Sequence, residues 1–378
     1  MGAPFLTNKM RKPEDELTDL KQRGLLRGLR PIRNPDLPIV ELQGRKLINF
    51  SSNDYLGLSQ HPILIEAATK ALRDYGTSST ASRLICGSLE IFHQLEEKIA
   101  TLKKAEAALT FANGFVTAMG VIPALMSKGD TVILDKLAHA CLIDAAKLSG
   151  ATLRIFPHND LNKLEKLLAS SNGRTLIVTE SVFSMDGDLC PLSEIVKLKE
   201  KYGALLFLDE AHAIGILGQT GQGLAEKLGL QDQIDFQMGT LGKSLGSAGG
   251  YLASSRSWID LFINKTRSLI YSTAPPPSQA AASLAALDLL NSPEGIERRG
   301  RLKTYSDSFA SPTPIIPKII GENRSALAAS DSLLKSGFLV PAIRYPTIPR
   351  GTARLRITLS AAHTTENLND LKEALALL

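Results

Sequence analysis

Lys243 stands among five glycines in the segment Gly239–Gly250, directly after an apolar run. Glycines permit positive φ and let a flat or phosphorylated group approach the backbone closely. A lysine in that setting suits three chemistries. It could belong to a phosphate-binding loop, it could neighbour a hydrolase nucleophile at Ser244, or its amine could condense with an aldehyde cofactor to form a Schiff base.

The first two chemistries fit the sequence less well than the third. The phosphate-binding pattern G-x-x-x-x-G-K-[ST] needs a glycine at position 237, which is occupied by Gln237. The nucleophile pattern G-x-S-x-G is met around Ser244, but the Ser, Asp, His order then requires His363, the one histidine downstream. His363 stands in a polar stretch that predicts the start of a helix. A Schiff base at Lys243 is therefore the favoured chemistry.

A carboxylate and a histidine upstream support this choice. Asp209 ends the most apolar run of the chain, Ala204–Leu208, and His212 follows three residues later. A carboxylate at the end of a buried strand suits a pyridinium nitrogen, because its charge keeps the ring protonated and able to accept electrons. Asp209 taken alone is more typical of a strand-end residue that caps a loop. Followed by a glycine-flanked lysine, with a histidine alongside, it predicts a cofactor site.

Short apolar runs alternate with helical patterns between about residues 60 and 255. The predicted strands are Thr131–Leu134, Leu153–Phe156, Thr175–Thr179, Ala204–Leu208 and Gly250–Ala253. The predicted helices include Leu64–Tyr75, Phe92–Leu102, Leu161–Ala169 and Leu192–Lys201. Continuous apolar strands separated by helices indicate an α/β fold with a mostly parallel sheet covered on both faces. Ligands of such sheets bind outside the carboxyl ends of the strands.

The chain is expected to divide into three parts. Residues 1–50 predict an amphipathic opening segment followed by a hairpin around Gly44. Residues 51–278 form the large domain, and residues 279–378 form a smaller α/β domain. A proline-rich break at Ala274–Pro277 separates these two, and the helices Gln279–Leu290 and Leu368–Leu378 are expected beyond it.

Composition favours a globular protein that binds neither nucleic acid nor a membrane. The chain has 378 residues, 44% of them hydrophobic and 21% charged, with a net charge of +5. Its densest basic run, Arg298 to Lys303, predicts a solvated helix face more than a nucleic-acid site. Three scattered cysteines, no metal-ligand spacing, no apolar run of about 18 residues and no leader pattern at the start predict a cytoplasmic protein without metal or membrane span.

The ordered motifs of the chain resemble the α-oxoamine synthases, which are fold-type I pyridoxal-phosphate enzymes. The resemblance runs from about residue 20 to the C-terminus. It includes Ser82-Arg83 with Gly87 and His93, and the lysine loop. Five further stretches carry it: Asn49–Leu58, Asp135–Ala140, Thr179–Asp188, Asp209–His212 and Tyr271–Pro275. It implies a large domain with a mostly parallel sheet, a smaller C-terminal α/β domain, and a homodimer whose active site lies at the interface.

The resemblance assigns the cofactor contacts of pyridoxal 5'-phosphate. Lys243 forms the Schiff base and moves the Cα proton, Asp209 pairs with the pyridine nitrogen, and His139 stacks on the ring. His212 and Ser184 lie near the phenolic oxygen. The implied phosphate contacts are the backbone N–H groups of Gly114 and Phe115, the hydroxyl of Thr240, and, from a partner subunit, Ser272 and Thr273.

The resemblance also implies the substrates. The segment Ala342–Arg356 is most similar to members that condense L-alanine with a pimeloyl thioester, carried by coenzyme A or acyl carrier protein, in biotin synthesis. Arg356 is the expected contact for the amino-acid carboxylate, because a guanidinium binds a carboxylate with two parallel hydrogen bonds. Arg354 lies two residues before Arg356 and would point to the same face of a strand. The alternative is therefore that both arginines lie on a solvated face. Arg27, with Arg30 nearby, and Thr347 are expected to contact the thioester, and Asn53 to line the site.

Two other functions stay open. A related enzyme would use glycine and acetyl-CoA, and some relatives are non-catalytic partner subunits. The retention of Lys243, Asp209 and His139 together argues against the latter. The chain also departs from the family in Gly76–Arg83, where many members carry a run of glycines, and in a short connection after Lys303. The first departure could alter the acyl channel, and the second predicts a trimmed surface loop.

Overall fold

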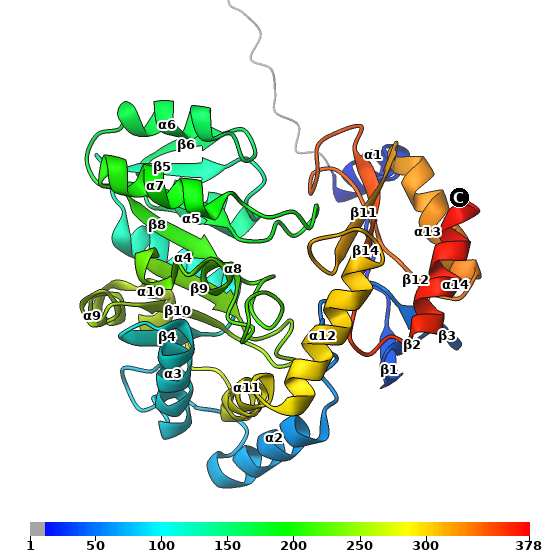
Figure 1. The fold of residues 1–378 in the computed structure, drawn as a ribbon, viewed down its shortest axis with the longest axis horizontal. Helices are drawn as coiled ribbons and strands as arrows, with labels where there is room; N and C mark the ends of the chain where they lie inside the picture. The colour runs from blue at the N-terminus through cyan, green and yellow to red at the C-terminus, as the bar shows by residue number, and fades with distance from the viewer. Residues whose placement is uncertain (1–11) are drawn as a thin grey trace, which may run out of the picture. The chain divides into compact units, whose positions relative to one another are not determined.

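The computed structural model describes residues 12–378 (Figure 1). The contacts between residues divide this part of the chain into two units, which are described separately. The large unit contains residues 52–316 and 358–368, and the small unit contains residues 12–51, 317–357 and 369–378. The predicted three-part division of the chain stays a prediction.

A seven-stranded sheet forms the centre of the large unit, in the order β4-β10-β9-β8-β7-β5-β6. All strands run in one direction except β10, which pairs antiparallel with both its neighbours. The predicted fold, a mostly parallel sheet, is confirmed. The strands are β4 (Ala107–Phe111), β5 (Thr131–Asp135), β6 (Thr152–Phe156), β7 (Thr175–Glu180), β8 (Leu205–Asp209), β9 (Phe236–Thr240) and β10 (Gly250–Ser254).

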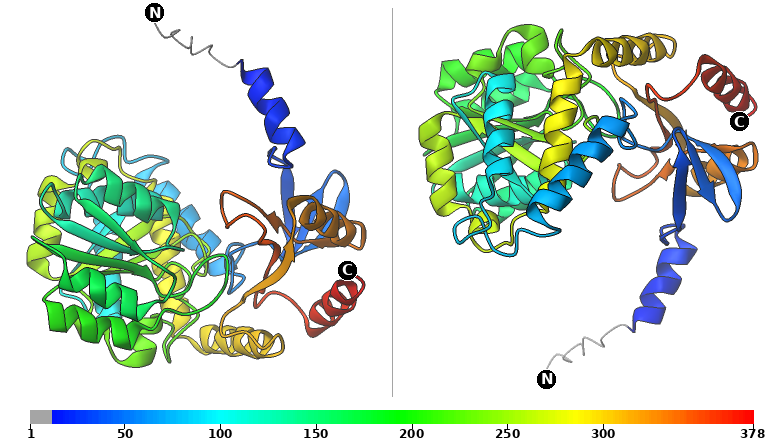
Figure 2. Two further views of the ribbon diagram at one scale, coloured as in Figure 1. Left: turned by 90° about the horizontal axis from the view of Figure 1, so that it is seen from above. Right: turned by 90° about the horizontal axis from the view of Figure 1, so that it is seen from below.

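Helices cover both faces of this sheet (Figure 2). The central strands are apolar without alternation because both of their faces are buried, as in β5 and β7. The helices of the large unit are α2 (Pro62–Tyr75), α3 (Glu90–Lys103), α4 (Gly114–Leu125), α5 (Ala140–Leu148), α6 (Leu161–Ala169), α7 (Leu192–Tyr202), α8 (Leu224–Leu228), α9 (Arg256–Lys265), α10 (Arg267–Ile270), α11 (Pro277–Leu290) and α12 (Pro293–Asp307).

The small unit begins with α1 (Pro13–Gln22) and a short antiparallel arrangement of β1 (Ile32–Asp36), β2 (Ile39–Leu42) and β3 (Arg45–Asn49). The predicted hairpin is confirmed, since Gln43 and Gly44 turn between β2 and β3 with φ of 53° and 76°. The remaining elements are β12 (Phe338–Leu339), which pairs with β3, α13 (Asn323–Lys335), α14 (Thr365–Ala376), and a three-stranded sheet of β11 (Ile315–Gly321), β14 (Ala353–Thr358) and β13 (Ala342–Ile343).

The predicted elements are confirmed to within three residues at each end. The connection after α12 consists of residues 308–314, and the prediction that it is trimmed stays a prediction. The interpretation of the basic run as a solvated helix face is wrong for Arg299. This side chain is buried and donates to the main-chain carbonyls of Leu290 and Gln219. Burial lowers the pKa of its guanidinium.

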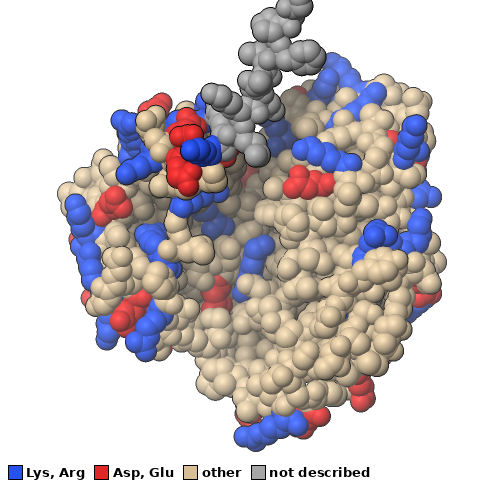
Figure 3. All heavy atoms as spheres, turned by 180° about the vertical axis from the view of Figure 1, so that it is seen from behind, with Lys and Arg blue, Asp and Glu red and all other residues tan. Residues whose placement is uncertain are grey.

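In Figure 3, most basic and acidic side chains lie near the margins of the face, and a broad area without charged side chains covers the lower right of the view. No helix among residues 12–378 is long and apolar enough to span a membrane. In the same range, no group of three or more His, Cys, Asp or Glu side chains is placed to hold a metal ion. Cys86, Cys141 and Cys190 are unpaired thiols. The expectation that the sequence starts without a leader pattern concerns residues 1–11, which lie outside the described residues.

Candidate active site

The predicted cofactor residues of the large unit follow the carboxyl ends of neighbouring strands. Asp209 ends β8, and Thr240 ends β9, three residues before Lys243. His139 follows β5, and Gly114 follows β4. Because the parallel strands β4, β5, β7, β8 and β9 all end at one edge of the sheet, residues far apart in sequence come together there.

Asp209 is a buried carboxylate in reach of positive charge. One carboxylate oxygen accepts a hydrogen bond from the backbone N–H of Ala211 at 2.8 Å. Burial raises the pKa of the Asp209 carboxyl, and the ammonium of Lys243 opposes that rise. The sheet edge therefore presents a carboxylate that gains stability from a cation beside it.

Lys243 lies in a loop that joins two antiparallel strands. Leu241 and Gly249 are bridged by a backbone hydrogen bond of 3.0 Å, and the chain then enters β10. Gly246 has φ of +61°, and a Cβ there would come within 2.6 Å of the Leu58 carbonyl carbon. No helix follows Ser244, so the loop is neither a phosphate-binding loop nor a nucleophile elbow, both of which open a helix.

His139 is the N-cap residue of helix α5, and it is partly exposed to solvent. Its Nδ1 accepts from the backbone N–H of Cys141 at 3.2 Å, and its own backbone N–H donates to the Glu180 carboxylate at 2.5 Å. Partial burial lowers the pKa of the His139 imidazole, as does the charge of Lys243, while Asp209 opposes them. Sequence reasoning did not single out Glu180, whose buried carboxyl has a raised pKa.

A tyrosine connects two of the predicted residues. The hydroxyl of Tyr55 donates to Asn53 Oδ1 at 3.2 Å and lies 2.6 Å from Nδ1 of His212. An amide oxygen can only accept, so Nδ1 of His212 carries the proton if both hydrogen bonds form together. Tyr55 was missed because a tyrosine next to apolar residues such as Leu56 and Leu58 is more typical of the core, and its ring is fully buried.

The start of α4 offers unused hydrogen-bond donors. Asn113 caps the helix by accepting from Val116, whereas the N–H groups of Gly114 and Phe115 have no acceptor among residues 12–378. A Cβ at Gly114 would come within 2.6 Å of Cγ2 of Thr240. The hydroxyl of Thr240 is itself buried without a partner among the described residues. These groups form a cradle for an anion at a helix N-terminus.

Comparison with known proteins places this arrangement in a family. Residues 45–375 match the family described as aminotransferase class I and II. An 8-amino-7-oxononanoate synthase from Geobacter sulfurreducens is 46% identical over 375 residues, which cover 96% of each chain. A serine palmitoyltransferase from S. paucimobilis, solved with PLP and myriocin bound, has a TM-score of 0.89 at 28% identity, with 95% of this chain and 94% of that chain covered. An 8-amino-7-oxononanoate synthase from Francisella tularensis has a TM-score of 0.75 at 28% identity, with 88% and 96% covered.

The chain belongs to the aminotransferase class I and II family, and within it to the α-oxoamine synthases. The edge of the large sheet fits pyridoxal phosphate on two independent observations. The cradle of Gly114, Phe115 and Thr240 supplies unused donors that suit a phosphate. The buried carboxylate of Asp209 suits a protonated ring nitrogen.

Three predicted cofactor residues lie on loops of the same unit. Ser184 is half-buried in the hairpin that follows β7. Ser272 and Thr273 lie between α10 and α11, where the hydroxyl of Ser272 makes only a 3.5 Å contact with the Thr273 carbonyl. Both are predicted to serve a partner subunit, and their roles stay predictions.

The segment Gly76–Arg83 contains a strained residue. Thr80 has φ of +58°, a left-handed conformation that is unfavourable for a β-branched side chain. Ser79 holds the loop by donating to the Pro275 carbonyl at 2.7 Å, and Arg83 pairs with Glu96 at 2.8 Å. Glycine would adopt the Thr80 conformation without strain. Threonine at position 80 therefore strains the folded loop.

The small unit brings Arg27 and Thr347 together across 320 residues of sequence. A guanidinium nitrogen of Arg27 donates to the Thr347 hydroxyl at 3.2 Å. Both line a cavity of about 570 Å³ that also contains Arg30 and Arg344. Burial lowers the pKa of the Arg344 guanidinium, and the like charge of Arg27 lowers it further. The cavity is therefore suited to an anionic ligand.

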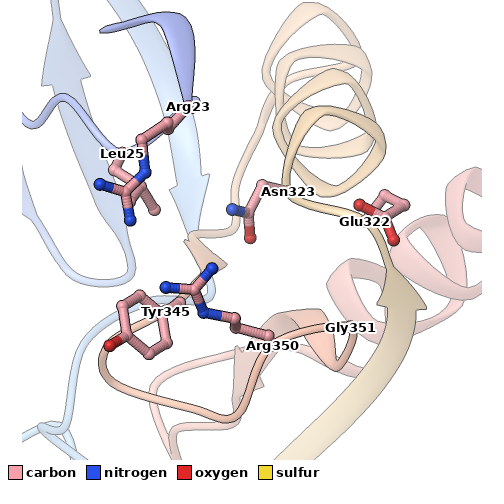
Figure 4. A pocket seen from close by; sticks show the side chains of 7 residues that line it. All are labelled: Arg23, Leu25, Glu322, Asn323, Tyr345, Arg350 and Gly351. Atoms are coloured by element: carbon pink, nitrogen blue, oxygen red, sulfur yellow. The ribbon is translucent and has the colours of Figure 1, made fainter. Parts of the chain in front are cut away.

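A second cavity of the small unit, of about 320 Å³, was not predicted (Figure 4). The guanidinium carbon of Arg350 lies 4.6 Å from the ring centroid of Tyr345, a cation–π contact. Asn323 at the start of α13 and Arg23 at the end of α1 also line it. It holds no residue that the sequence assigned to a substrate.

Arg356 lies on β14, all of whose side chains are buried. The alternative that Arg354 and Arg356 share a solvated face is wrong, because each is only 4% exposed. Arg354 donates to the Thr352 carbonyl at 3.2 Å. The position of the two arginines along the strand did not predict their burial, because a strand that is buried on both faces shows no alternation of polar and apolar residues.

Proposed function

We propose that this enzyme catalyses the decarboxylative condensation of L-alanine with a pimeloyl thioester to give 8-amino-7-oxononanoate, CO₂ and the free thiol carrier. One observation carries the proposal. A chain with 46% identity to an 8-amino-7-oxononanoate synthase over nearly its full length places a lysine, a buried carboxylate and an anion cradle at one sheet edge. Pyridoxal phosphate is its cofactor.

Lys243 is the group that moves protons. When bound, the cofactor's protonated pyridine ring accepts the electron pair that remains on Cα after the proton leaves. The amine of Lys243 takes the Cα proton of L-alanine and later returns a proton to the product, because an amine can serve as nucleophile and as base. The Cα–acyl bond forms, the thiol leaves, and the alanine carboxylate is lost as CO₂.

The other residues of the large unit bind the cofactor and adjust the charge on its ring. Asp209 keeps the proton on the ring nitrogen by its charge. His139 packs on the ring face, and its lowered pKa keeps the imidazole neutral at pH 7. His212, held by Tyr55, and Ser184 contact the phenolic oxygen. The phosphate binds the N–H groups of Gly114 and Phe115 and the hydroxyl of Thr240.

The small unit supplies the substrate contacts. Arg356 binds the alanine carboxylate with two parallel hydrogen bonds. Arg27 and Thr347, already joined by a hydrogen bond, contact the acyl thioester, and Asn53 of the large unit lines the site. The active enzyme is a cytoplasmic homodimer in which Ser272 and Thr273 reach the phosphate of the partner subunit's cofactor.

Substrate assays test this function. Purified protein loaded with pyridoxal phosphate is given L-alanine with pimeloyl-CoA, pimeloyl acyl carrier protein, or acetyl-CoA, and glycine with the same donors. The free thiol, CO₂ and the mass of the product are measured. The proposal expects the alanine and pimeloyl pairs to have the highest kcat/KM. A higher value for glycine with acetyl-CoA would establish the alternative, and no turnover with any pair would indicate a non-catalytic subunit.

A further inference from the structure

His158, a residue with no assigned role, lies between two carboxylates of the large unit. Its Nδ1 is 3.0 Å from Oδ1 of Asp135, and its Nε2 is 2.7 Å from Oδ2 of Asp188. Its ring also meets the edge of Phe183, with the ring centroids 4.3 Å apart. Asp135 ends β5, His158 follows β6, and Asp188 lies in the hairpin after β7, so all three lie at the carboxyl edge of the sheet.

The geometry determines the protonation state of this histidine. A carboxylate can only accept hydrogen bonds, so each ring nitrogen that faces one must carry a proton. The two carboxylates raise the pKa of His158 to about 10, although burial alone would lower it. His158 is therefore an imidazolium at neutral pH.

Asp135, at one end of this contact, anchors the segment that leads to His139. Asp135 is fully buried at the end of β5, and its second oxygen accepts from the backbone of Asn159 at 3.0 Å. Its first oxygen also accepts from the backbone of Leu137 at 2.8 Å. Four residues after Asp135, the chain reaches His139 and begins α5.

The other end controls the hairpin that carries Ser184. The backbone of Phe183 donates to the Asp188 carbonyl at 3.1 Å, and Gly187 returns a bond of 2.8 Å to the Phe183 carbonyl. The side chain of Asn159 donates to Asp188 and to the Leu189 carbonyl, both at 3.2 Å. The hairpin is thus tied to His158 and its neighbour at several points.

We propose that His158 is a positioning residue that holds the His139 loop and the Ser184 hairpin in register on either side of the cofactor. The carboxylates of Asp135 and Asp188 both face His158. Among residues 12–378, no lysine or arginine pairs with either carboxylate. Without the cation, a fully buried carboxylate at Asp135 is costly, and the two loops separate or rearrange to reach water. The inference rests on the cofactor roles proposed for His139 and Ser184.

His158→Gln tests the proposal. Glutamine keeps the approximate size, but it is neutral and can donate from one end only, so its oxygen faces a carboxylate. The dissociation constant of pyridoxal phosphate is expected to rise about 10- to 100-fold, by analogy with the loss of affinity when residues that orient metal ligands are replaced. The visible absorption of the bound cofactor is expected to change in its position or in the pH at which it titrates. Asp188→Asn, which leaves the Asp135 contact, gives a smaller effect in the same direction if His158→Gln does not fold.

His61→Gln is the matched control. His61 is a buried histidine of the same unit that pairs with Glu294 at 3.1 Å and caps α2, and it is not among the residues assigned to the cofactor or the substrates. It is expected to lose thermal stability without any change in cofactor affinity or spectrum. If His158→Gln and Asp188→Asn behave like this control, His158 only stabilises the fold and the proposal is overturned. Because these readouts involve cofactor alone, they are independent of which acyl donor the enzyme uses.

Discussion

The edge of the large sheet and the arginine-lined elements of the small unit are built in different ways. At the sheet edge, Asp209 and Thr240 end the adjacent parallel strands β8 and β9, and Lys243 follows three residues after Thr240, so the fold itself gathers them. In the small unit, Arg27 and Thr347 come from opposite ends of the chain and meet through a side-chain hydrogen bond. The first arrangement follows from topology, and the second depends on individual side chains.

This difference predicts a division of labour. We expect the large unit to hold the cofactor, which every reaction of the family needs. We expect the small unit to contact the substrates, through Arg356 for the amino acid and through Arg27 and Thr347 for the acyl thioester. Substitutions at the sheet edge should therefore lower kcat, and substitutions in the small unit should raise KM.

The largest effect is expected for Lys243→Ala. Loss of both the nucleophile and the base is expected to lower kcat by at least about 10⁴-fold. Stopped assays with L-alanine and pimeloyl-CoA measure it. The control is Ser244→Ala, which removes the adjacent buried hydroxyl, a group with no partner among the described residues. Near-normal activity in Lys243→Ala, or a comparable loss in Ser244→Ala, would contradict the assignment.

Asp209→Asn is expected to have the next largest effect. The amide keeps the shape but removes the charge that holds the ring nitrogen protonated, so kcat is expected to fall about 10²- to 10³-fold. The protein should still bind pyridoxal phosphate, which absorption spectroscopy checks. A rise in the KM for alanine with unchanged kcat would place Asp209 among the substrate contacts and break the proposed division.

Arg356→Lys tests the small unit. Replacement of a two-point contact by a single ammonium is expected to raise the KM for L-alanine about 10- to 100-fold with a smaller change in kcat. Arg354→Lys is the control, because Arg354 is equally buried on the same strand and donates to a main-chain carbonyl. The reverse order of the two effects would exchange their roles.

A smaller effect is expected for Arg27→Ala. Loss of one guanidinium contact should raise the KM for the pimeloyl thioester about tenfold and leave the KM for alanine unchanged. Arg30→Ala is compared in the same assay, because both side chains line the same cavity. A larger effect at Arg30 would move the thioester contact there.

The smallest effect concerns stability and pH. The pKa of His158 is raised to about 10 from its usual value near 6.5. A raised pKa means that its stabilisation is complete below about pH 6.5 and is lost as the pH rises through about 10. The difference in unfolding free energy between wild type and His158→Gln, measured by denaturant titration, should therefore shrink across that range. A difference that is constant with pH would show that His158 is neutral in the folded protein.

The sequence predicted the sheet edge better than the small unit for a physical reason. Buried parallel strands leave long apolar runs, and a polar residue after such a run, like Asp209, is conspicuous. Glu180 was missed because it ends an equally apolar strand, and no sequence pattern records the hydrogen bond that its carboxylate accepts from a backbone N–H. His158 was missed because its two carboxylates come from separate loops.

The small-unit residues were expected from resemblance alone. Neither periodicity nor spacing relates Arg27 to Thr347, since their hydrogen bond closes a loop of most of the chain. Parity suggested an exposed face for Arg354 and Arg356, yet β14 is buried on both sides. Alternation of apolar and polar residues reveals which side chains are buried when one face of a strand contacts water. A strand that is buried on both faces shows no such alternation.

The most direct test of the account is the position of the covalent link. Protein loaded with pyridoxal phosphate is reduced with borohydride, digested and mapped by mass spectrometry. The account predicts a single pyridoxyl group on the peptide that contains Lys243. A pyridoxyl group on another lysine, or none at all in protein that retains the yellow cofactor, would contradict it.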